Sequence, residues 1–541
     1  MCSFKWNRPD QLEYLLYELV RWDSRTLTEG EKEFAHKLKR KLLELDYFQT
    51  NSRYLNLHHV GMDRFAVTAL YKNDQIRDTI VLLSHYDTVH TGEYGDLGEL
   101  AFQPKALRNA LKERKDDLPE DARNDLESGE YIFGRGTMDM KMGLALHMRL
   151  LEQAIVEKWP INLLLVTVPD EEVNSAGMRA VVPELLRLEK AHKLNYKLFL
   201  NGEPSFSQTP GDENHYIYSG SIGKIMPTAL IYGKETHVGE PLSGITSNYI
   251  ASFLTQQMEW NPLFKETDIE EETPLPVTLL QKDLKMEYST QTPHRGKALY
   301  NVFMMKRTAK ETMELFRKVA EEAAIQCNQQ YKQMCQRENI TPIGQIRVRT
   351  YEELYYYAVK KYGVKTISQI KEEVIQNQLL DDREKSIRIA DQLMIACQEL
   401  GPAIVLLYSP PYYPAVNSSD HPLIKKLVPL IKETAKQSFQ TNIKQIHYFN
   451  GISDLSYLSY DESYNGWDVY KTNTPVWGET YEIPFSEMSK LQAPVLNVGP
   501  FGKDAHKLTE RLHTRSAFIE IPFLLETIIK SMFPVKEINV T

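Results

Sequence analysis

The sequence predicts an α/β fold, a mostly parallel sheet with helices on both faces, together with an inserted second domain of the α+β class. Three short apolar runs, Thr79–Ser84, Ile161–Val168 and Tyr196–Leu200, have the length and composition of buried strands. A helical stretch, Lys141–Trp159, separates the first two, and strands that alternate with helices are typical of parallel sheets. The near-continuous apolar character of these strands indicates burial on both faces.

Helical spacing of apolar residues begins near the N-terminus and returns along the chain. Leu12, Leu15, Leu16 and Leu19 predict a helix over residues 9–21, and similar spacing predicts a second helix over residues 30–46. The charged span 93–130 is predicted to be a long surface excursion with one helix. Further helices are expected over residues 312–337, 351–399, 421–437 and 516–532, and further strands over residues 224–232 and 403–408.

The length of the chain and a change of pattern in its middle predict more than one domain. At about 150 residues per domain, 541 residues predict several domains or one domain with large insertions. We expect residues 206–410 to form the inserted α+β domain, enlarged by extra helices over residues 345–399. Residues 1–205 and 411–541 are then expected to form the α/β domain that binds metal and carries out catalysis.

Composition excludes several classes of protein. The net charge of -9 gives no general attraction to nucleic acid or anionic lipid, and the longest apolar runs are too short to span a bilayer. The four cysteines form no C-x-x-C pair and are too few for a disulfide framework, which indicates a reducing compartment. Residues 1–10 contain no apolar signal segment. We therefore expect a cytoplasmic protein with neither nucleic acid nor membrane as a partner.

Histidine and acidic residues gather where the predicted strands end. In an open α/β sheet, side chains beyond the carboxyl ends of the strands converge on the ligand site. Two histidines with several carboxylates are the ligand types expected for zinc or a related divalent ion. The segments are Ser84–Val89, Gly134–Lys141, Asp170–Glu172, Gly202–Pro204 and, far downstream, Gly502–His506.

Each segment alone has a plainer interpretation. His85 could be a loop residue with an ordinary hydrogen bond, and the run Asp170–Glu172 could be the acidic first turn of a helix. The segments around Asp139 and Glu203 could be simple turns. The joint occurrence of the five segments, in this order, favours a metal site.

These segments resemble the signature motifs of a metallopeptidase and aminoacylase family that includes glutamate carboxypeptidase, acetylornithine deacetylase, succinyl-diaminopimelate desuccinylase and peptidase T. The resemblance implies a zinc-exopeptidase-like (phosphorylase/hydrolase-like) fold and two divalent metal ions, zinc first, with cobalt or manganese as alternatives. It implies that Glu171 is the general base and that Asp87 orients the ring of His85. The metal ligands it implies are His85, Asp139, Glu172, Glu203 and His506.

The inserted domain carries a further motif, Gly233–Pro241, that resembles a segment of the family's second domain. The resemblance implies that His237 stabilises the oxyanion formed during hydrolysis and that Asn248 flanks the cleft. An arginine of this domain, Arg295 or Arg307, is expected to bind a substrate carboxylate. The enlarged insertion leaves two alternatives open, a monomer or a homodimer.

We therefore expect an enzyme that cleaves an amide bond of a small peptide or an N-acyl amino acid. The chain's length and insertions resemble those of a long member of the family, the arginine-utilisation protein of bacilli, which implies a role in amino-acid catabolism. Two alternatives remain: a non-catalytic, metal-containing binding or regulatory protein, and an aminopeptidase that acts on free N-termini.

Overall fold

The computed structural model describes residues 4–209, 211–212, 214–461 and 466–534, and the chain divides into two compact units. Unit 1 comprises Met1–Ser221, Val416–Tyr460 and Pro484–Thr541, and unit 2 comprises Ile222–Ala415 and Asp461–Ile483. The chain thus enters and leaves unit 2 later than the predicted limits of 206–410. A second, short segment, 461–483, also belongs to unit 2.

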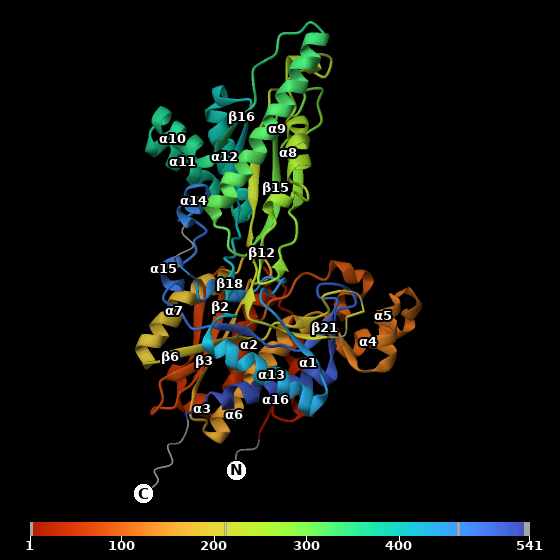
Figure 1. The fold of residues 1–541 in the computed structure, drawn as a ribbon, viewed down its shortest axis with the longest axis vertical. Helices are drawn as coiled ribbons and strands as arrows, with labels where there is room; N and C mark the ends of the chain where they lie inside the picture. Colours follow the sequence, from red (N-terminus) through yellow and green to blue (C-terminus); the bar gives the residue numbers. More distant parts are fainter. Residues whose placement is uncertain (1–3, 210, 213, 462–465, 535–541) are drawn as a thin grey trace. The chain divides into compact units, whose positions relative to one another are not determined.

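An eight-stranded sheet in the order β1-β2-β5-β3-β6-β20-β8-β19 forms the core of unit 1 (Figure 1). The neighbours β5, β3, β6 and β20 run parallel, whereas β1, β2 and β8 pair antiparallel with a neighbour. The prediction of a mostly parallel α/β sheet is confirmed. The strands are β1 (Leu55–Gly61), β2 (Arg64–Tyr71), β3 (Asp78–His85), β5 (Asn162–Val168), β6 (Asn195–Asn201), β8 (His215–Tyr218), β19 (Ile443–Ile446) and β20 (Val495–Asn497).

Helices cover this sheet because its central strands are apolar on both faces. All seven residues of β5 are buried, so neither of its faces meets solvent. Helix α6 packs against β2, β3 and β5, while α2 and α7 pack against β1 and β2. The helices of unit 1 include α1 (Pro9–Arg21), α2 (Glu29–Leu42), α6 (Met142–Glu157), α7 (Ala176–His192), α13 (Pro422–Phe439) and α16 (Ile521–Ser531).

A second, four-stranded sheet of unit 1 has the order β4-β22-β21-β7. Its strands are β4 (Tyr131–Phe133), β22 (Arg511–His513), β21 (Phe501–Lys503) and β7 (Ser205–Phe206). The excursion that precedes β4 contains the 3-10 turn η2 (Gly92–Leu100) and two α-helices, α4 (Pro104–Glu113) and α5 (Glu120–Ser128), where the sequence predicts one. The prediction was wrong because each helix buries only a few apolar residues among many charges.

Unit 2 is built on a sheet in the order β10-β15-β11-β17-β16, and a further strand, β14, also pairs with β15. Helices α8 (Ser247–Met258) and α9 (Ala309–Arg337) lie side by side along it (Figure 1). The region predicted as helical forms α10 (Tyr351–Tyr362), α11 (Val364–Ile375) and α12 (Asp382–Ala396), so the enlarged α+β domain is confirmed as a fold class. The strands are β10 (Gly223–Ile225), β11 (Pro227–Tyr232), β14 (Val277–Asp283), β15 (Arg295–Met304), β16 (Arg347–Thr350) and β17 (Ala403–Tyr408).

Among the residues that the structure describes, no helix combines the length and the apolar character needed to cross a bilayer. The longest helix, α9, contains 29 residues but carries charged side chains along its length.

Candidate metal centre

The ends of three parallel strands carry the acidic and histidine side chains of unit 1. His85 is the last residue of β3, whose neighbours are β5 and β6. Glu171 and Glu172 follow the end of β5, and Glu203 follows the end of β6. Because these strands run parallel, their carboxyl ends lie at one edge of the sheet and bring the four side chains together.

Two further side chains reach this edge from loops. Asp139 lies in the turn Thr137–Lys141 before α6, and His506 lies in the loop between β21 and β22. The Nε2 atom of His85 is 3.2 Å from Oδ1 of Asp139, and the Nε2 atom of His506 is 3.0 Å from Oδ2 of the same carboxylate. Asp139 therefore presents one oxygen to each histidine.

Around Asp139 the side chains form two clusters that share this residue. His85, Asp139 and Glu203 form the first cluster, and Asp139, Glu172 and His506 form the second. Within each cluster the potential ligand atoms lie within 4.8 Å of one another. Glu203 completes the first cluster at 3.5 Å from His85, and Glu172 completes the second at 3.2 Å from His506. All five residues that the family resemblance implied as ligands are thus brought together.

Asp87 lies behind the two clusters and connects their strands. Its side chain is fully buried, and its two carboxylate oxygens accept the backbone N–H groups of Glu171 at 3.1 Å and Glu172 at 3.3 Å. The hydroxyl of Thr26 donates to the same carboxylate at 2.9 Å. The Nδ1 atom of His85 lies 3.1 Å from the backbone oxygen of Asp87 and 3.5 Å from its carboxylate. One buried residue thus orients the ring of His85 and the turn that carries both glutamates.

Glu171 belongs to neither cluster, although it is adjacent in sequence to Glu172. Its Oε2 atom is 3.9 Å from Nε2 of His85, and its side chain is 11% exposed. Burial raises the pKa of Glu171 well above its ordinary value, and the nearby carboxylates of Asp454 and Glu203 raise it further, whereas His85 lowers it. Glu171 is therefore a buried carboxyl group that lies beside the clusters without belonging to either of them.

The clusters concentrate negative charge in a buried place. Burial raises the pKa values of Glu172 and Glu203, and neighbouring carboxylates such as Asp139 add to the effect. Burial disfavours a charged His506, but its hydrogen bonds to Asp139 and Glu172 outweigh this effect and raise its pKa to about 11. Buried carboxylates are stable when they are paired with cations or coordinate metals. The nitrogen and oxygen donors therefore fit two divalent ions of the zinc type.

Two glycines allow the turn before Glu203 to lie directly against α6. A Cβ atom on Gly143 would lie 2.4 Å from the carbonyl oxygen of Gly202, far inside a normal contact distance. A Cβ atom on Gly202 would lie 3.0 Å from the Cα of Gly143. Glycine at position 143 is therefore required for the Asp139 turn, which leads into α6, to approach the Glu203 turn this closely, and glycine at position 202 relieves a further tight contact.

Comparison with known proteins agrees with this geometry. Residues 81–466 match the model of peptidase family M20/M25/M40. The chain belongs to this family. The match extends over more than half of the sequence, and the family resemblance seen in the motifs is confirmed.

Two relatives from Bacillus subtilis (strain 168) match nearly the whole chain. The chain is 40% identical to the uncharacterized protein YqjN over 98% of both chains. It is 31% identical to protein RocB over 96% of this chain and 94% of that protein. Among solved structures, the M20 family metallo-carboxypeptidase Sso-CP2 from Sulfolobus solfataricus aligns with a TM-score of 0.55 over 96% of this chain and 98% of that one, at 13% identity. This structural likeness shows the M20 peptidase fold.

A buried arginine supports the turn that carries the two glutamates. Arg64 donates to the carboxylate of Asp170 at 2.8 Å and lies 3.5 Å from that of Glu31. Asp170, in a left-handed conformation with φ of 66°, also accepts the backbone N–H of Ala176. Arg64 could not be anticipated from the sequence, because no motif marks the start of β2. Asp170 itself gave a usable signal, since it directly precedes Glu171.

The predicted residues of unit 2 have well-defined local partners. His237 is exposed, and its Nδ1 atom accepts the backbone N–H of Gly239 at 3.1 Å. Asn248, also exposed, donates to Asp283 at 3.4 Å. Both residues belong to unit 2 and the clusters to unit 1, and the roles of His237 and Asn248 at the metal clusters stay predictions.

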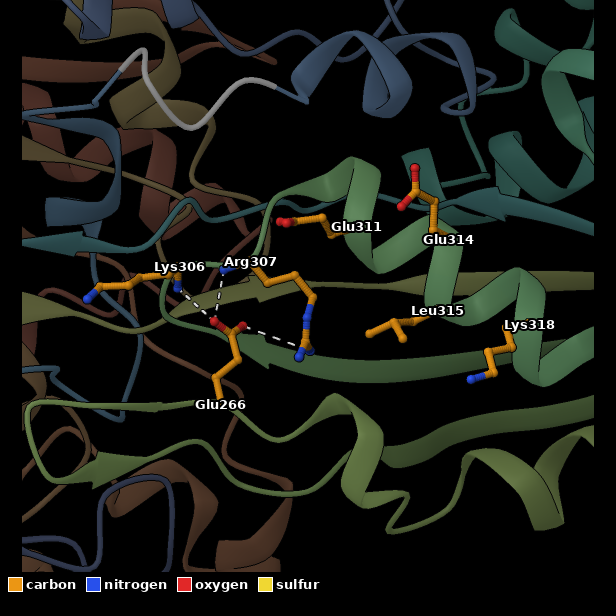
Figure 2. Close-up of a pocket in the computed structure, with 7 residues that line it drawn as sticks. All are labelled: Glu266, Lys306, Arg307, Glu311, Glu314, Leu315 and Lys318. Atoms are coloured by element: carbon orange, nitrogen blue, oxygen red, sulfur yellow. Dashed lines mark hydrogen bonds and ion pairs between the residues drawn. The ribbon is translucent and has the colours of Figure 1, made fainter.

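The two predicted substrate-binding arginines already have partners in unit 2. Arg295 pairs with the buried carboxylate of Asp391 at 2.9 Å. The guanidinium of Arg307 donates to the carbonyl oxygen of Phe264 at 2.8 Å and lies 3.9 Å from Glu266. Figure 2 shows Arg307 beside Glu266 in a hollow of about 580 Å³. A substrate carboxylate would therefore compete with an existing partner at either arginine.

Proposed function

We propose that this protein is a metal-dependent hydrolase that uses two divalent metal ions, with zinc as the first candidate, to cleave an amide bond of a small peptide or an N-acyl amino acid. The observation that carries the proposal is the position of Asp139, whose two oxygens face His85 and His506 at 3.2 Å and 3.0 Å. A carboxylate with one oxygen toward each cluster is suited to bridge two cations.

The residues divide into two ligand sets with one shared member. His85, Asp139 and Glu203 would hold one ion, and Asp139, Glu172 and His506 would hold the other. When bound, such ions lower the pKa of a water molecule, polarise a substrate carbonyl and stabilise the charge that develops on it. Asp139 offsets part of the repulsion between the two cations, since its carboxylate is shared.

Glu171 supplies the proton transfers in this proposal. Its buried carboxylate accepts a proton from the attacking water and then delivers it to the nitrogen of the leaving group. The position of Glu171 favours this role, because its carboxyl group lies 3.9 Å from Nε2 of His85 and yet belongs to neither ligand set. Glu172 cannot serve in the same way, because its side chain turns toward His506 at 3.2 Å.

Replacing Asp87 with asparagine is expected to weaken metal binding and activity by about 10–100-fold, the range that follows loss of a hydrogen-bond partner behind a metal ligand. Asparagine keeps one accepting oxygen, but its NH₂ group cannot accept, so one of the N–H groups of Glu171 and Glu172 loses its partner. Zinc affinity from competition with a chelating dye, together with kcat, measures the effect. A matched control is Asp63→Asn, on the exposed turn before β2; equal losses in the two variants would contradict the role of Asp87.

The proposed reaction can be tested directly with the purified chain. We expect a panel of N-acyl amino acids and dipeptides, assayed with added zinc, cobalt or manganese, to reveal turnover that a chelator abolishes and metal restores. Activity on blocked but not on free N-termini would identify a deacylase, and the reverse an aminopeptidase. Stoichiometric metal binding without turnover on any substrate would contradict catalysis and favour a binding protein.

The substrate is expected to be a compound that is degraded in amino-acid catabolism, with arginine derivatives among the candidates. This part of the proposal rests on the resemblance to the arginine-utilisation protein of bacilli and on the 31% identity to protein RocB. Acylated arginine and arginine-containing dipeptides therefore belong in the panel, with the corresponding lysine compounds as the comparison.

A further inference from the structure

The loop that carries His506 is held at both ends by one fully buried arginine. Arg511 is the first residue of β22, and its side chain has no exposed surface. It donates to the carboxylate of Asp504 and to the backbone oxygen of Thr509, which lie on either side of His506. Asp504 and His506 both adopt left-handed conformations, with φ of 57° and 67°. A loop with such a backbone needs neighbouring contacts to keep its shape.

The other partners of Arg511 come from the surface excursion that precedes β4. Arg511 donates to Asp125 at 2.6 Å and to Asp121 at 2.5 Å, and both acids lie on α5. Lys503, at the end of β21, binds the same two carboxylates, Asp121 at 3.0 Å and Asp125 at 2.9 Å. Helix α5 thus contacts the strand before the His506 loop and the strand after it.

The same excursion also contacts the turn that carries Asp139. Arg135 is buried and forms ion pairs with Glu93, in η2, and with Glu510, in the loop after His506. Glu510 also accepts the backbone N–H of Gly136 at 2.7 Å. The excursion, the Asp139 turn and the His506 loop are therefore joined by two buried arginines.

We propose that the excursion 92–130 positions His506 against Asp139 and thereby sets the metal affinity of the second cluster, Asp139, Glu172 and His506. The inference rests on the proposed metal-binding function and extends it to residues that touch no metal ligand directly. Asp121 and Asp125 act as positioning residues through Arg511 and Lys503. The first cluster, whose His85 ends β3 and whose Glu203 follows β6 of the large sheet, has no such dependence on α5.

The test uses the full-length chain with one cluster disabled at a time. Glu203→Gln removes a ligand of the first cluster, and Glu172→Gln removes a ligand of the second. In the Glu203→Gln background, the additional changes Asp121→Asn and Asp125→Asn are expected to lower the affinity for Zn²⁺ by about tenfold or more. In the Glu172→Gln background, the same two changes should leave the affinity for Zn²⁺ unchanged.

Two control variants separate positioning from folding. Asp96→Asn removes a bidentate pair with Arg114 in the same excursion, away from the His506 loop, and should change neither affinity. Lys503→Gln removes the other positively charged side chain that pairs with α5. It should lower the affinity for Zn²⁺ in the same background as the two asparagine changes. The melting temperature of each metal-free variant reports any general loss of stability.

The outcomes distinguish this inference from the function on which it rests. Equal losses in both backgrounds, or no loss in the Glu203→Gln background, would overturn the positioning role and leave the metal-dependent function intact. An unaltered chain that binds no Zn²⁺ would overturn the proposed function, and this inference with it.

Discussion

The Glu171→Gln variant is expected to retain its metal and to lose activity by about a hundred- to ten-thousandfold, the contribution typical of a general acid–base group. The change removes the proton acceptor but keeps the shape of the side chain. Glu171 belongs to neither of the two ligand clusters, so the metal ligands stay in place and most of the metal should be retained. Zinc per chain by elemental analysis and kcat on the best substrate of the panel measure the two effects.

Glu172→Gln provides the matched comparison for this result, because it makes the same chemical change one residue away. Glu172 lies 3.2 Å from His506 in the second cluster, so its replacement should lower the metal content as well as the activity. Substantial turnover by Glu171→Gln, or a loss of metal as large as that in Glu172→Gln, would contradict a separate role for Glu171 in proton transfer.

The residues of the candidate centre could be anticipated because they follow strands with strong local signals. The runs that precede His85, Asp170 and Glu203 are apolar over most of their length, which predicts buried parallel strands. Parallel strands place their carboxyl ends at one edge, so side chains that are distant in the sequence were expected to meet. His506 follows no such run, and it became a candidate because its segment is the last of the five and because of the family resemblance.

Other parts of the fold left no comparable local signal. Strands β1, β14 and β15 were not predicted, although β15 is ten residues long and central to the sheet of unit 2. The residues of β14 alternate between exposed and partly buried, and none is fully buried. Few of its side chains therefore identify it as a strand. Such strands are stabilised by pairing with distant segments, which a short stretch of sequence does not reveal.

The buried charges were the hardest feature to predict. Arg511 looks like an ordinary surface residue in the sequence, yet it is fully buried because Asp121, Asp125 and Asp504 surround it. Two of these acids, Asp121 and Asp125, precede Arg511 by nearly 400 residues in the sequence. Arg295, one of the two arginines expected to bind a substrate carboxylate, likewise pairs with an acid distant in the sequence, the buried Asp391.

The Asp139→Asn variant is expected to lose both metal ions, unlike the replacement of any other residue in the two clusters. Asp139 is the shared member, and an amide can offer neither the negative charge nor two equivalent oxygens to His85 and His506. The loss of zinc affinity should exceed the about 10–100-fold that follows loss of a partner behind a ligand. Activity should fall together with the metal content. It should not return when zinc is added in a small excess over the protein.

Stepwise titration with zinc distinguishes this prediction from a simple loss of one site. Glu203→Gln should retain one ion and Glu172→Gln should retain the other, whereas Asp139→Asn should show neither step. Circular dichroism of the metal-free variants controls for folding. One tightly bound ion in Asp139→Asn would mean that the carboxylate serves a single cluster, and the bridging arrangement on which the proposed reaction rests would have to be abandoned. Loss of both ions from Glu203→Gln as well would show instead that the two ions bind cooperatively, since Asp139 is intact in that variant.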